Sequence, residues 1–102
     1  MADLSVLNGP PSDPVNVAVT GAVELKAGAS RLGERRVILV QPLDGDIYWC
    51  YRDEDNSTDA PTTDNSFILR EGQMQGLEAS DKLAVWAIAA SGTVNVRIQE
   101  IG

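Results

Sequence analysis

The sequence predicts an all-β protein, a small antiparallel β-sandwich or barrel of six to seven strands with an extended Pro-rich N-terminal arm. Short segments alternate apolar and polar residues, turn residues separate these segments, and no stretch has the apolar spacing of an ordinary helix. A length of 102 residues corresponds to one domain. We expect the arm over residues 1–14 and the β-sandwich domain over 15–102.

The arm contains Gly9, Pro10, Pro11 and Pro14. Prolines at this density favour extended backbone and disfavour helix. Such a terminus usually frays unless a neighbouring element or subunit holds it. We therefore include the three prolines among the candidate interface residues.

The first expected strand covers 15–25. Val15, Val17 and Val19 alternate with more polar or smaller residues, and the alternation continues to Leu25. This period of two is typical of a half-buried strand, here with a bend at Gly21. A Gly/Ala/Ser connection follows over 27–33.

The next two segments, 36–42 and 47–51, are predicted to form a hairpin around Asp44-Gly45, a strong turn signal. That pairing sets Leu39 opposite Cys50 on one face. On the other face it sets Ile38 opposite Tyr51 and Val40 opposite Trp49, so both faces are apolar. A polar loop over 53–66, a short strand over 66–70 and a turn region over 71–81 follow, with Met74 in a brief edge strand.

A second hairpin is predicted from 83–90 and 93–101 around Ser91-Gly92. One of its faces is a core face, on which valines and alanines pair: Val94 with Ala89, Val96 with Ala87, and Ile98 with Val85. The other face sets Arg97 beside Trp86, which suits a cation–π contact.

The residue types argue against catalysis. The chain has no histidine, which removes the usual general base, and Cys50 is expected to be a buried, inert thiol. The acidic loop that begins at Asp53 resembles the start of a calcium loop. It has Thr58 and Asp64 where that motif needs Gly and Glu. We predict no catalytic residues, no cofactor and no metal site.

The charge excludes other partners. The formal net charge is −7, and such an acidic surface repels both nucleic acid and anionic membranes. The N-terminus lacks the basic start and apolar stretch of a signal peptide.

Large apolar side chains remain on the second faces of both expected hairpins. Either these side chains all belong to one sandwich core, or a surplus is left for a partner. The candidate interface residues are Pro10, Pro11, Pro14, Ile38, Val40, Trp49, Tyr51, Trp86, Ile88 and Arg97.

The C-terminal stretch LAVWAIAASGTVNVRIQEIG resembles the ends of small bacteriophage virion proteins whose genes lie near major capsid genes. The upstream segments GAVELKAGASRLGERRVILVQPLDGDIYWCYR and FILREGQ match that family in kind, so the resemblance covers about residues 18–101. The chain departs from it at Gln41, where Asn is usual, and at Trp49-Cys50-Tyr51, which replaces a Gly-rich segment.

The resemblance implies a virion structural component without catalytic residues. The leading expectation is a capsid decoration (cement) protein made in the host cytoplasm. It would sit on the capsid exterior and pack against the major capsid protein as a homo-oligomer, with a trimer favoured. The alternative is a tail, fibre or spike adaptor that binds host glycans by stacking Trp86 or Trp49 on sugar rings, with the 53–66 loop lining the site.

Overall fold

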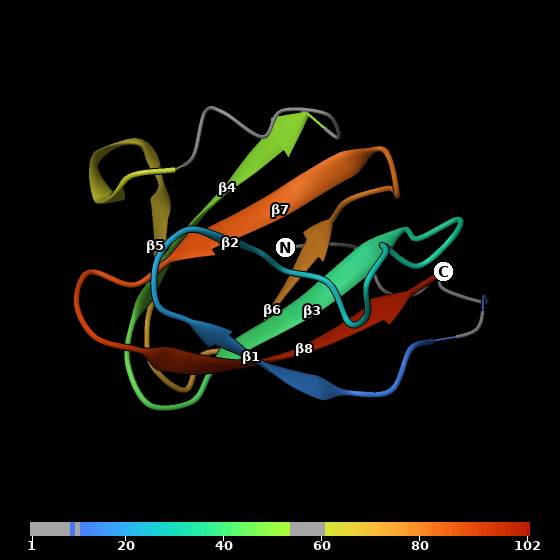
Figure 1. Cartoon of the computed structure of the whole chain (residues 1–102). Coiled ribbons are helices and arrows are strands. Elements are labelled where there is room, and N and C mark those ends of the chain that lie inside the picture. The colour runs from blue at the N-terminus through green and yellow to red at the C-terminus, as the bar shows by residue number, and fades with distance from the viewer. Residues whose placement is uncertain (1–8, 10, 54–60) are drawn as a thin grey trace.

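A computed structural model describes residues 9, 11–53 and 61–102 and shows two four-stranded antiparallel sheets packed face to face (Figure 1). The predicted β-sandwich is confirmed, with eight strands among the described residues where six to seven were expected. Sheet A has the strand order β1-β8-β3-β6, and sheet B has the order β2-β7-β4-β5. The elements are β1 (Val15–Val19), β2 (Val23–Glu24), β3 (Val37–Pro42), β4 (Ile47–Asp53), the 3-10 helix η2 (Thr63–Asn65), β5 (Phe67–Leu69), β6 (Gln75–Glu78), β7 (Leu83–Ile88) and β8 (Val94–Ile101). Over the described ranges, no helix is long and apolar enough to cross a membrane.

Both predicted hairpins are wrong, because the strands of each pair lie in opposite sheets. Strand β3 pairs with β6 and β8, whereas β4 pairs with β5 and β7. Strands β7 and β8 are separated in the same way. The single strand expected over 15–25 also divides into β1 in sheet A and β2 in sheet B.

The turn over 43–46 shows why the chain crosses between sheets there. The Leu43 N–H donates to the Asn95 carbonyl at 2.8 Å, and the Asp44 carboxylate accepts from the Asn95 backbone N–H at 2.7 Å. A Cβ on Gly45 would lie 2.9 Å from Cγ2 of Val94, so the turn packs directly on the start of β8. The turn is therefore fixed by a distant strand and not by the two strands that flank it.

The predicted core face is confirmed, although its two halves meet across the sandwich and not within one sheet. Val85, Ala87 and Ala89 from the segment of β7 are buried, as are Val94, Val96 and Ile98 of β8. They belong to one cluster with the inward-facing residues of β3. Opposed inner faces of two sheets form the core of such a sandwich.

The described part of the arm runs along β8 beyond the end of β1. Pro11 forms an isolated antiparallel bridge with Ile101, and the Ser12 N–H donates to the Glu100 carbonyl at 2.8 Å. The Gly9 N–H donates to the Gly102 carbonyl at 3.0 Å, and a Cβ on Gly9 would lie 2.6 Å from the Gly102 carbonyl carbon. Only glycine allows that approach.

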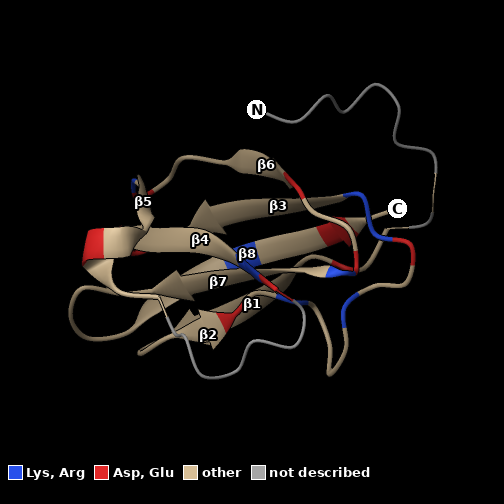
Figure 2. Ribbon diagram, turned by 90° about the horizontal axis from the view of Figure 1, so that it is seen from above, with Lys and Arg blue, Asp and Glu red and all other residues tan. Residues whose placement is uncertain are grey.

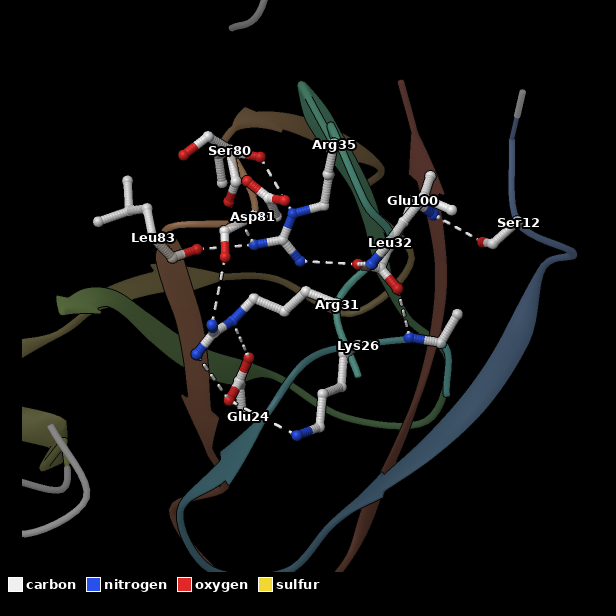
Figure 3. Close-up of polar contacts among 12 residues, drawn as sticks. Ser12, Glu24, Lys26, Arg31, Leu32, Arg35, Ser80, Asp81, Leu83 and Glu100 are labelled. Carbon is white, nitrogen blue, oxygen red and sulfur yellow. Dashed lines mark hydrogen bonds and ion pairs between the residues drawn. The ribbon is translucent and has the colours of Figure 1, made fainter. Parts of the chain in front are cut away.

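A buried ion pair, Arg35–Glu100, closes one end of the sandwich (Figure 3). The two side chains are 0% and 1% exposed, and Arg35 Nη1 lies 2.8 Å from Glu100 Oε2. The remaining Arg35 N–H groups donate to the carbonyls of residues 79, 80 and 83. The Glu100 carboxylate also accepts from the N–H groups of residues 27 and 32. One pair of side chains thus ties the 25–36 loop and the 79–83 turn to β8.

Candidate functional site

The outer face of sheet B carries several large apolar side chains, with charged residues at Glu24 beside Trp86 and at Arg52 beside Ala84. Residues paired across neighbouring strands point to the same side of a sheet, and Tyr48 pairs with both Ile68 and Ile88. In the next row Cys50 pairs with Trp86. The alternate residues of β4 and β7 belong to the core or pack against it, so these rows face outward. We call Tyr48, Ile68, Trp86 and Ile88 the sheet B face.

Three aromatic rings gather on the inner side of sheet B, next to its edge strand β5. The ring centroids of Trp49 and Tyr51 are 5.3 Å apart at an interplanar angle of 82°, and those of Trp49 and Phe67 are 5.3 Å apart at 41°. Phe67 is 66% exposed and Tyr51 36%. We call Trp49, Tyr51 and Phe67 the aromatic edge.

The Tyr51 hydroxyl connects the aromatic edge to the other sheet. It donates to the carbonyl of Glu78 in β6 at 2.9 Å. Partial burial raises the pKa of the Tyr51 phenol, and the charge of the Glu78 carboxylate adds to this effect. The phenol therefore stays protonated and keeps its donor role at neutral pH.

Strand β5 joins the sheet B face to the aromatic edge. Strand β5 is the edge strand of sheet B, next to β4 (Figure 1). Phe67 and Ile68 are consecutive residues of β5, so their side chains point to opposite sides of the sheet. Ile68 is 40% exposed. The three residues of β5 carry no charge, although charged side chains are a common protection of an edge strand. The apolar surface thus continues around the edge of the sandwich.

The opposite outer face, on sheet A, carries mainly polar side chains. Its middle strands present Asn95, Arg97 and Gln99 from β8 and Gln41 from β3. Figure 2 shows charged residues mainly in loops and near strand ends, with a basic segment within β8. The two outer faces therefore differ in their large apolar side chains, and the part of sheet B that holds Tyr48, Ile68 and Ile88 is the candidate for a protein interface.

The structure separates the candidate interface residues into groups. Trp86 and Ile88 lie on the sheet B face, and Trp49 and Tyr51 on the aromatic edge. Pro11 and Pro14 are exposed beside sheet A, whereas Pro10 lies outside the described residues.

Ile38 and Val40 are corrections to the sequence analysis. Both are 0% exposed, because β3 is a central strand whose alternate side chains point into the core. The Arg97–Trp86 contact is also wrong, because the two residues lie in different sheets. The Arg97 Nε–H donates instead to the Asn16 side-chain oxygen at 3.1 Å.

Sequence reasoning missed Phe67, Ile68 and Tyr48 as surface residues. The available signal was Phe-Ile-Leu in β5, since a strand with apolar residues at every position has no polar side for solvent. Tyr48 was left out of the candidate interface residues because the predicted hairpin put it on the face of Leu39 and Cys50, not on the face of Trp49 and Tyr51.

Chemical sites are scarce in the described ranges. They contain no group of three or more residues suited to holding a metal ion. Cys50 is a free, buried thiol, and the described buried side-chain polar atoms all have hydrogen-bond partners. Residues 54–60 of the acidic loop lie outside the described part of the chain.

Comparison with known proteins gives no match, either to a protein-family model or to a curated protein sequence.

Proposed function

We propose that this protein is a structural, non-enzymatic subunit of a bacteriophage virion, most simply a capsid decoration (cement) protein. It docks through the sheet B face and the aromatic edge against the major capsid protein on the capsid exterior. The observation that carries this proposal is that β5 exposes apolar side chains on both of its sides, including a 66% exposed phenylalanine. The resemblance of residues 83–102 to phage virion proteins supports the choice of partner.

The energy available from this surface favours an oligomer. Full burial of one large apolar side chain contributes roughly 1.5–3 kcal/mol, and the sheet B face has four such side chains, three of them already half-buried. Covering them yields on the order of 3–6 kcal/mol gross, from which association costs are subtracted. A single copy would therefore bind weakly. A trimer that engages three sites at once would gain avidity without new contacts.

A capsid-binding experiment tests the proposal. The double variant Phe67→Ser/Ile68→Ser removes the two most exposed apolar groups of β5, and Ala18→Ser, at an exposed position of β1 in the other sheet, is the control. Protein is mixed with empty capsids assembled from the major capsid protein of the same phage, and co-sedimentation is measured. We expect the double variant to lose at least about tenfold in affinity, equivalent to about 1.4 kcal/mol, while Ala18→Ser binds like the parent.

Light scattering after size exclusion measures the oligomeric state in parallel, with a trimer expected. A strict monomer that ignores capsids would contradict the proposal, as would a double variant that decorates capsids as well as the parent.

The aromatic edge also supports a second candidate, a fibre, spike or tail adaptor that binds host glycans. Phe67 exposes most of its ring beside Trp49, and aromatic rings stack on sugars. A glycan array probed with the parent and with Phe67→Ser distinguishes the two. Specific glycan binding that the substitution abolishes would favour the adaptor.

A further inference from the structure

We propose that a hollow on the outer face of sheet A is an anchor site for a partner segment in which a large apolar side chain adjoins a carboxylate. The residues that line the hollow include Pro14, Leu39, Gln41, Met74, Arg97 and Gln99. The site lies on the opposite sheet from the surface proposed above, so both can be occupied at once. The proposed anchor site does not depend on the protein being part of a virion.

The register of sheet A explains the hollow. Leu39 of the central strand β3 is flanked by Gln99 of β8 and by Gly76 of β6. Because Gly76 has no side chain, nothing from β6 covers Leu39 on that flank. Met74, 49% exposed, stands just before β6 and forms part of the apolar wall.

The size of the hollow selects its occupant. Its volume is about 200 Å³, below the range of about 300–1,000 Å³ typical of small-molecule sites. The space suits one large apolar side chain of a polypeptide. Interfaces commonly place such an anchor in a pocket of this kind.

The charge of Arg97 indicates which group should lie next to that apolar side chain in the partner segment. Of the outward-facing residues of sheet A, whose four strands are all described, Arg97 and Glu78 are charged. Glu78 of β6 pairs with Val37, whereas Arg97 pairs with Gln41, four positions further along β3. The ion pairs among the described residues involve Lys26, Arg31, Arg35 and Arg70, and Arg97 is not among them. Its hydrogen bond to neutral Asn16 leaves the guanidinium charge without a counterion there. A carboxylate beside the apolar anchor supplies that counterion, and arginine binds carboxylates with a well-matched planar geometry.

The test uses a blocked hexapeptide, acetyl-Ser-Gly-Leu-Asp-Gly-Ser-amide, titrated into isotopically labelled protein and followed by amide chemical shifts. We expect a dissociation constant near the millimolar range, with shifts centred on Leu39, Arg97 and Gln99. Replacing the peptide Asp by Asn, or Arg97→Gln in the protein, should each weaken binding about fivefold, as for an exposed ion pair. Lys82→Gln removes the same charge elsewhere and should leave the constant unchanged.

Several results would overturn the proposal. One is equal binding of the Asp and Asn peptides, and another is shifts confined to the sheet B face. A third is the absence of shifts at a peptide concentration ten times the expected dissociation constant of about 1 mM. Concentration-dependent shifts of the hollow in the free protein would identify the occupant as a second copy of this chain and not an acidic partner segment. A failure of the peptide to bind the hollow would not contradict capsid binding through the sheet B face, because Arg97→Gln does not alter that face.

Discussion

Breaking the buried Arg35–Glu100 pair should cost a large part of the stability of the fold. The substitution Glu100→Gln removes the negative charge but keeps the side-chain volume. It leaves the Arg35 cation, whose side chain is 0% exposed, without a counterion. In the parent protein, the Glu100 carboxylate accepts hydrogen bonds from three N–H donors. The glutamine amide replaces one carboxylate oxygen by an NH2 group, which would face at least one of these donors without being able to accept from it.

Removing one partner of a buried pair typically costs about 3–5 kcal/mol. A domain of this size has a free energy of unfolding of about 5–15 kcal/mol, so the variant should be marginally stable. At about 4–8 °C per kcal/mol, the loss lowers Tm by at least about 12 °C. Arg35→Gln/Glu100→Gln leaves neither residue charged and should cost less than the sum of the two single substitutions.

Urea unfolding followed by tryptophan fluorescence and circular dichroism measures these differences, with an unchanged m-value as the sign of an unchanged unfolding transition. Arg70→Gln is the control, since it breaks an ion pair whose side chains are 65% and 38% exposed and should cost less than about 1 kcal/mol. A Glu100→Gln protein within about 1 kcal/mol of the parent would refute the assignment of this pair as a structural tie.

Three further substitutions test local contacts. Asn95 donates backbone and side-chain N–H groups to Asp44, which holds the pKa of that carboxyl below its usual range. The resulting stability is present above the unfolded-state pKa near 3.9 and is lost as pH falls through the folded-state pKa, so Asp44→Asn should flatten the acid limb of a Tm-versus-pH curve. The raised pKa of Tyr51 gives stability that is present below about pH 10 and lost as pH rises through the folded-state pKa. Tyr51→Phe should therefore flatten the alkaline limb, and an unchanged limb in either variant would contradict its assignment. Gly45→Ala places a Cβ 2.9 Å from the Val94 side chain and should cost about 1–3 kcal/mol in urea unfolding, whereas parental stability would show that the turn does not pack on β8.

The candidate site was only partly predictable from the sequence. Trp86 and Ile88 were placed on an outer face because they alternate with the small core residues of β7. The exposure of Phe67 and Ile68 depends on β5 being the last strand of sheet B, and nothing in Phe-Ile-Leu specifies a place in the strand order. The hollow on sheet A likewise depends on Leu39 lying beside Gly76, which is 37 positions further along the chain.

Local residue patterns are enough to establish that the chain forms strands, where most of its turns fall, and which side chains of β7 and β8 point into the core. These features follow from a period of two and from local turn chemistry, which neighbouring residues express without help from distant ones. Strand pairing, in contrast, depends on contacts between distant parts of the chain. The same alternation fits a hairpin within one sheet or a crossing between two, and the choice depends on contacts such as Gly45 against Val94 and Arg35 with Glu100. Those contacts join residues about 50–65 positions apart, whose energies act only once the chain has folded.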